Sequence, residues 1–362
     1  MRLAITGVGM VTAVGYGAAG SCAAIRAGIS RPRELEDFTI ADGEGGSHAV
    51  VGHPVTGFAE GFCQVGAWVR LAAGGLEDLR HVVRLPEPGE VGFWRRTGLM
   101  ALAPVVDPER FSWSLEEQPD ALLEEYARPL ARLARFPIAD EHIRSLGMGH
   151  CGLAVALQQA RALLSERRLE RVVIVGADSY VDPGSLEWLH QGNRLKGPQK
   201  QTGLMPGEAG ASVMVESEHS ARGRSAPLGG QVRAVAVSAE HVFPRAPPPV
   251  LGRALAAVIQ QCLEEARATT PFRGYLMLDL NGEDWKAHAW GHAMIHLTAS
   301  IDFERCRTLL PCESLGELGA ASGPVAFGLA VSELLRARSD AGALLCSLSD
   351  SGQVAAVLLA RF

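Results

Sequence analysis

Two side chains capable of nucleophilic chemistry stand next to each other in the segment GMGHCG, residues 147–152. The residues that follow have the apolar spacing of a helix, so His150 and Cys151 are expected at a helix N-terminus. A helix N-terminus stabilises negative charge and lowers the pKa of a thiol. A histidine there can act as a base or as a transient acyl acceptor. The segment is therefore a candidate catalytic centre.

No metal or other cofactor is expected. His288, His292 and His296 recur every four residues, which places them near one face of a helix. Adjacent pairs could share a metal, but three histidines at this spacing span two turns and no acidic ligand accompanies them. We therefore expect a stripe that faces a partner. The pair Gly7 and Gly9 lacks the third glycine of a dinucleotide site, and no Walker sequence is present.

The order of several segments resembles the β-ketoacyl-ACP synthases of the thiolase superfamily. Residues 5–15 (ITGVGMVTAVG) are similar to the family's opening VTGxGxVTPxG, and residues 193–216 are similar to its central segment. Residues 279–283 (DLNGE) match the position of the NxHGT loop, and residues 315–323 (LGELGAASG) match GHxxGAAG. The resemblance implies an α/β chain with the duplicated thiolase fold, an αβαβα five-layer sandwich.

The residues on which condensation depends in that family are replaced. The resemblance places His150 at the nucleophilic cysteine, Glu283 at the first catalytic histidine and Gly316 at the second. Pro311 falls on the family's lysine, and Asp350 falls on its gating phenylalanine. A carboxylate at the first histidine position would repel the enolate that two imidazoles normally stabilise. We therefore expect that the condensing centre has been lost.

Two alternatives retain chemistry at this place. Cys151 would be the nucleophile if the helix were one residue shorter, but one position corresponds to a rotation of ~100°, which turns the thiol into the packing. His150 and Glu283 could form a histidine–carboxylate pair, which raises the histidine pKa and suits acyl transfer or thioester hydrolysis. The competing interpretation is a structural imidazole in an inactive pocket. The pocket residues predicted from the resemblance are Gly316, Asp350 and Asn281.

The chain also repeats itself. Aligning Gly152 with Gly323 gives two copies of a glycine-bearing elbow, a small-residue helix, a charged turn and an apolar strand. Parallel strands joined by a crossover helix require this pattern. We take the halves as residues 1–220 and 221–362, fused into one unit. Residues 30–66 have no strong period and are predicted to be a loop-rich excursion.

The composition excludes some classes of protein. A net charge of −6 and a pI near 6.0 give no electrostatic footprint for nucleic acid. The seven cysteines lie mostly in apolar runs and are expected to be reduced thiols. The first residues form a strand pattern without a signal peptide, and no apolar run would span a bilayer. We therefore expect a cytoplasmic protein that does not bind a membrane.

The resemblance implies a homodimer or a heterodimer with a related chain, because subunits of that family pair a strand across a two-fold axis. An acyl-carrier protein or another protein is a further expected partner. Inactive thiolase-like proteins are also associated with bacterial type VI secretion effector loci, which suggests a loading or adaptor role. The predicted interface anchors are Trp188, Trp285, Trp290 and residues 247–249.

Overall fold

Two groups of five strands, identical in order, form one continuous sheet. The structure, a computed structural model, describes residues 2–41, 45–111, 113–114, 118, 120–238, 248–337 and 341–362. The sheet strands are β1 (Leu3–Thr12), β4 (Thr97–Ala103), β5 (Ile143–Gly147), β6 (Arg171–Ser179), β7 (Glu208–Ser217), β8 (Gly230–Val237), β9 (Tyr275–Leu278), β10 (Arg307–Leu309), β11 (Ala343–Leu348) and β12 (Val354–Ala360). The first group runs β5-β4-β6-β7-β1 and the second β10-β9-β11-β12-β8. The predicted duplication is confirmed.

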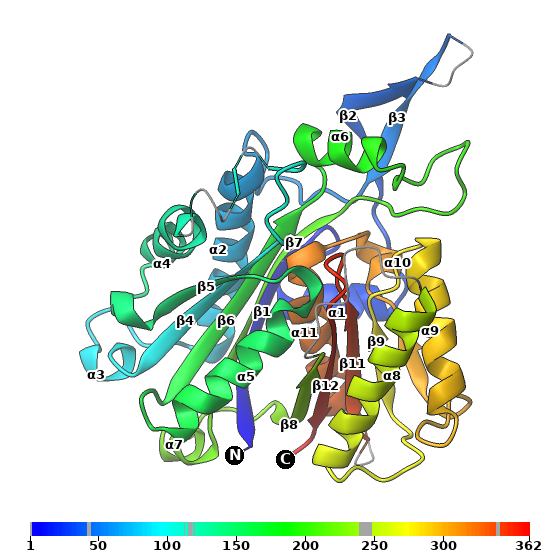
Figure 1. Cartoon of the computed structure of the whole chain (residues 1–362). Helices are drawn as coiled ribbons and strands as arrows, with labels where there is room; N and C mark the ends of the chain where they lie inside the picture. The colour runs from blue at the N-terminus through cyan, green and yellow to red at the C-terminus, as the bar shows by residue number, and fades with distance from the viewer. Residues whose placement is uncertain are drawn as a thin grey trace.

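The two groups of strands form two of the five layers, and helices form the other three (Figure 1). They are α1 (Ala18–Arg26), α2 (Gln64–Val83), α3 (Val91–Trp94), α4 (Arg128–Leu133), α5 (Gly152–Ser165), α6 (Pro183–Gln191), α7 (Glu218–Gly223), α8 (Pro248–Glu265), α9 (Asp284–Leu297), α10 (Cys312–Leu315) and α11 (Ser322–Arg336). Helix α2 covers the outer face of the first group, and α8 and α9 cover that of the second. Helices α5 and α11 pack against each other in the central core. These are the five predicted layers.

Strands β1 and β8 join the two groups along an antiparallel contact that starts at Leu3 and Val232. The predicted division at residue 220 falls within α7, between the last strand of the first group and the first strand of the second.

Small residues let the two central elbows approach each other. A 3-10 turn at Gly149–Cys151 leads into α5, and its counterpart at Gly319–Ala321 leads into α11. A Cβ on Gly323 would lie 2.9 Å from the Cβ of Leu153, and one on Gly176 would lie 2.6 Å from the carbonyl oxygen of Ala320. Side chains at these positions would force the layers apart, so the glycines place the two elbows side by side.

The predicted loop at residues 30–66 is wrong in part. Strands β2 (Arg33–Ala41) and β3 (Ser47–Gly52) form an antiparallel hairpin, which extends away from the sheet above α6 (Figure 1). Its apolar side chains, including Leu35 and Ile40, pack on a small cluster that contains residues of α6. A register shift between Leu35 and Thr39 breaks the alternation by which the sequence would have indicated a strand.

The predicted interface anchors do not share one environment. Trp290 is only 9% exposed and packs edge-on against Phe303 in the core beside α8, so its assignment as a surface anchor is wrong. Trp188 and Trp285 are half-buried and line a cleft. Residue 247 lies outside the described residues. Among the described residues, no helix is both long and apolar enough to cross a membrane.

Candidate functional site

The two elbows bring His150 and Glu317 into contact. His150 lies in the turn after β5, where Gly149 adopts a φ of 52°, and it is 3% exposed. Its Nε2 lies 2.8 Å from Oε1 of Glu317, which lies just before the second elbow. The two halves of the duplicated fold therefore each contribute one side chain to a buried histidine–carboxylate pair.

Charges around Glu317 keep this pair ionised. The Gly319 N–H donates to Oε1 at 2.8 Å, and the Asn281 amide donates to Oε2 at 2.5 Å. Burial would raise the pKa of Glu317, but the positive charges of His150 and Lys286 outweigh it and hold that pKa well below its usual value. Burial and Lys286 would lower the pKa of His150, but the attraction of Glu317 raises it above its usual value.

The predicted pair between His150 and Glu283 does not form, because Glu283 is held by Arg194. Nε and Nη2 of Arg194 each donate to a Glu283 oxygen at 2.8 Å, and Nη1 and Nη2 donate to the two Asp350 oxygens at 3.1 Å. Burial would raise the pKa of Asp350, but the charge of Arg194 keeps it below its usual value. Asn281 links the two layers, because its amide also donates to Glu283 at 2.9 Å.

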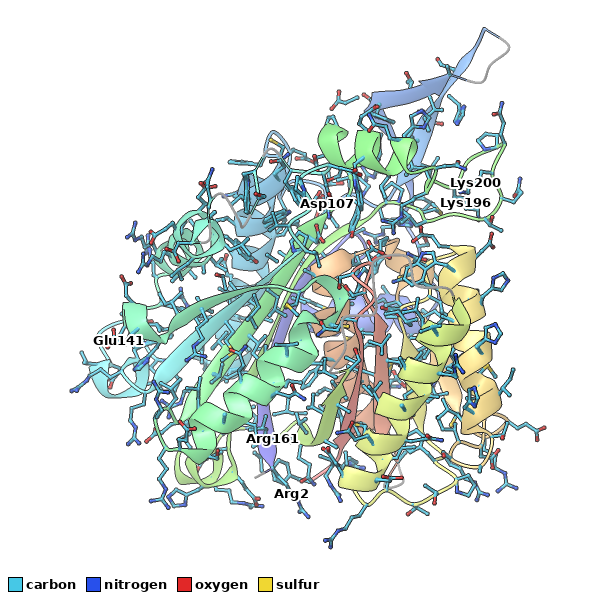
Figure 2. The ribbon with its side chains drawn as sticks, viewed as in Figure 1. Arg2, Asp107, Glu141, Arg161, Lys196 and Lys200 are labelled. Atoms are coloured by element: carbon cyan, nitrogen blue, oxygen red, sulfur yellow. The ribbon has the colours of Figure 1, made fainter. Side chains whose placement is uncertain are left out.

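A cleft of about 910 Å³ ends at this arginine and its two carboxylates. Asp107 and Lys200 also line it, and Figure 2 shows Asp107 above the upper ends of the central strands and Lys200 to the right of them. The lining includes Arg194, Glu283 and Asp350 but neither His150 nor Glu317. The ion-paired layer therefore separates the cleft from the histidine.

The other predicted pocket residues lie below or beside the cleft. Asn281 is buried between the two carboxylates that it links and does not line the cleft. Gly316 has a φ of 70°, and a Cβ there would lie 2.7 Å from the carbonyl oxygen of Met205 and 2.9 Å from Cδ2 of His53. The chain thus has no room at Gly316 for the family's second catalytic histidine without rearrangement.

Cys151 is a buried thiol with a structural contact. It is 0% exposed, and its Sγ donates to the carbonyl oxygen of Gln353 at 3.3 Å. Burial raises the pKa of this thiol, so the reactive thiolate is disfavoured. The side chain points toward Gln353, just before β12, and does not line the cleft, as its one-residue rotation relative to His150 predicts.

Lys286, Glu317 and Arg194 are the residues of the site that the sequence analysis did not identify. Lys286 is 0% exposed, and its Nζ lies 3.4 Å from Oδ2 of Asp279 and 3.7 Å from Oε2 of Glu317. It supplies a buried ammonium, although the resemblance placed Pro311 at the family's lysine position. A lysine in the first turn of a helix normally signals an exposed residue. The motif match over residues 315–323 includes Glu317, but only at an unspecified position of GHxxGAAG, so the motif gave it no role.

Comparison with solved structures identifies the architecture. The ishigamide ketosynthase/chain length factor superposes with a TM-score of 0.78 at 17% identity, covering 100% of this chain and 99% of that one. The chain has the β-ketoacyl synthase fold. The oxazolomycin ketosynthase domain of Streptomyces albus JA3453 gives a TM-score of 0.76 at 16% identity, with 100% of this chain and 75% of that chain covered. A β-ketoacyl synthase from Burkholderia phymatum STM815 gives 0.72 at 15%, with 100% and 99% covered.

At these low sequence identities, the superpositions show the fold alone. The activity has to be inferred from the residues of the site. No protein-family model matches the sequence, and no curated protein matches it.

Proposed function

We propose that this chain is a non-catalytic binding subunit in which ion pairs have replaced the condensing centre of a β-ketoacyl synthase. The observation that carries the proposal is the layer formed by Arg194 with Glu283 and Asp350. It lies between the cleft and His150, and both of its carboxylates form ion pairs with the Arg194 guanidinium. Such a layer holds the two halves together, and the His150 imidazole beneath it is already paired with Glu317.

Condensation would need groups that this site lacks. The elbow offers an imidazole in place of a thiol, and the thiol of the next residue, Cys151, is buried with a raised pKa. Enolate stabilisation would fall to Glu283, which is an anion. Losing one such hydrogen-bond donor costs about 3–4 kcal/mol of transition-state stabilisation, and here both imidazole donors are replaced.

A second candidate function is acyl transfer or thioester hydrolysis. The hydrogen bond between His150 and Glu317 favours it, because a histidine oriented by a carboxylate is the usual arrangement of a general base. A substrate would have to displace Arg194 before it reached the imidazole. The sequence predicts a catalytic pair of His150 with Glu283 for this function. In the structure, the carboxylate that would orient His150 is Glu317.

The edge strand β5 supports a subunit role. It is hydrogen-bonded to β4 alone among the described strands, so its other edge is free to pair with a related or identical chain. One structural neighbour is a ketosynthase/chain length factor, and another is a ketosynthase in complex with an acyl-carrier protein. We propose a homodimer or heterodimer through β5. A carrier-protein partner and a role at type VI secretion effectors stay predictions, since no residue in the cleft specifies either.

The proposed loss of condensing activity is tested by measuring the turnover of thioester substrates. The purified chain is incubated with acyl-carrier-bound malonyl and acyl thioesters, with an active β-ketoacyl synthase in parallel, and the products are analysed by mass spectrometry. The proposal predicts a β-ketoacyl product from the active enzyme alone. A product formed by this chain and lost in His150→Ala would contradict it.

A further inference from the structure

A second cavity, on the outer helical face of the first half, has the opposite electrostatic character to the protein as a whole. It has a volume of about 470 Å³ and shares no lining residue with the cleft at Arg194. One wall is formed by residues of α2, and the other by residues 57–58 and by residues 133–135 at the C-terminal end of α4. Figure 1 shows α2 and α4 next to each other on this face, and the two helices are in contact. We call this cavity the α2–α4 groove.

Three arginines line the α2–α4 groove, against one carboxylate. Arg70 and Arg80 come from α2 and Arg135 follows α4, while Glu77 is the acidic residue. None of the three guanidiniums has a carboxylate oxygen within 4.0 Å in the described part of the chain. The groove is therefore locally positive on a protein whose net charge is −6.

The backbone and nearby rings hold two of these guanidiniums in place. Nη2 of Arg80 donates to the carbonyl oxygen of Ala134 across the groove, and its guanidinium lies 5.0 Å from the centre of the Phe136 ring. Nε of Arg70 donates to the Phe58 carbonyl oxygen at 3.3 Å. Preorganised charges lose less conformational entropy when a ligand binds.

The groove also has an apolar component. Leu133 is 48% exposed at its edge, and Phe58 and Ala73 are half-buried beside it. Its volume falls in the range of ligand pockets in general, roughly 300–1,000 Å³. An occupant that matches both features carries carboxylates for the arginines and an apolar side chain for Leu133.

We propose that the α2–α4 groove docks an acidic, partly apolar segment of a partner protein. Charge complementarity carries this choice, because none of the three arginines is ion-paired with a carboxylate among the described residues, and Glu77 is the one acidic residue in the lining. The proposal is independent of whether the cleft at Arg194 is catalytic, since the two cavities are separate.

The test uses two fluorescein-labelled peptides, one of alternating glutamate and leucine and one of alternating lysine and leucine, in anisotropy titrations of the full chain. Binding driven by the net charge of the protein would favour the lysine peptide, whereas the groove predicts tighter binding of the glutamate peptide, weakening as salt is added. Arg70→Gln combined with Arg135→Gln should reduce that affinity about tenfold. Glu77→Gln should raise it about twofold.

Arg253→Gln combined with Arg267→Gln is the matched control, because both residues are exposed and removing them changes the net charge equally. The control should leave the affinity unchanged. Equal loss in both double variants, or preference for the lysine peptide, would overturn the proposal. Self-association that depends on Arg70 and Arg135 without peptide binding would also overturn it, in favour of a second copy of the chain as the occupant.

Discussion

His150 Nε2 lies 2.8 Å from Glu317 Oε1, although the two residues belong to opposite halves of the duplicated fold. Both are almost completely buried, at 3% and 1% exposure. A buried ion pair of this kind is strongly destabilised when one partner is removed, because the other charge stays in a low-dielectric interior. The pair therefore acts as a junction between the halves.

The first prediction concerns His150→Gln and pH. The folded-state pKa of His150 is raised above 6.5, so its stabilisation is fully present below pH 6.5 and is lost as pH rises through the folded-state pKa. The pKa of Glu317 is lowered below 4.5. Its contribution to the free energy of unfolding is therefore present above pH 4.5 and is lost as pH falls through its folded-state pKa. The variant should lose about 3 kcal/mol at pH 5.5, and clearly less at alkaline pH, in urea unfolding. An equal loss at both pH values would contradict an ionised pair.

The second prediction concerns the layer above the pair. Arg194→Met should lower the free energy of unfolding by about 3–5 kcal/mol, because Glu283 and Asp350 would be left without a positive partner. Arg194→Lys should recover only part of it, since an ammonium cannot bind two carboxylates in bidentate geometry. Adding Glu283→Gln and Asp350→Asn to Arg194→Met should restore most of the stability. Chemical denaturation measures the free energy of unfolding of all three variants. If the triple variant does not recover stability, the ion-pair explanation is wrong.

The third prediction concerns Glu208, whose carboxylate accepts hydrogen bonds from Val55 N–H at 2.7 Å and from Ser179 Oγ at 2.8 Å. Burial raises its pKa from 4.5 to about 7. The protonated Glu208 carboxyl therefore contributes to the free energy of unfolding below pH 4.5, and this contribution is lost as pH rises to 7. Glu208→Gln should become more stable than the wild type across this window, by about 3 kcal/mol at its upper end. A stability difference that stays constant with pH would refute the assignment.

The fourth prediction concerns the free edge of β5. Ser145→Lys places a charge on that edge and should convert the proposed dimer to a monomer, as edge lysines block strand pairing. Analytical ultracentrifugation measures the change. Ser165→Lys, at the exposed end of α5, is the matched control and should stay dimeric. If both variants remain dimers, the interface lies elsewhere.

The sequence was informative wherever a pattern is local. Periodicity and small-residue spacing predicted α5, β6 and α11 and the repeat that relates them, because a buried crossover unit needs a continuous apolar run. The predicted strand at residues 172–178 is β6, Arg171–Ser179. The β2–β3 hairpin was missed because its irregular register removes the alternation that marks a half-buried strand.

The site was harder to predict because its contacts join residues far apart in the chain. Glu317 meets His150 across 167 positions, and no local pattern reports that contact. The resemblance predicted which positions depart from the family's catalytic residues but not which charged residues meet in the site. Lys286 reaches the site from the first turn of α9 and Arg194 from the loop after α6, so each required the fold to be known first.

The central claim is that His150 and Cys151 no longer take an acyl group. Intact mass spectrometry of the purified chain after incubation with acyl-CoA tests it most directly, alongside His150→Ala and Cys151→Ala. The account predicts the unmodified mass for all three proteins at every incubation time. An added acyl mass on the wild type that disappears in His150→Ala or in Cys151→Ala would contradict it and establish an acyl-transfer enzyme.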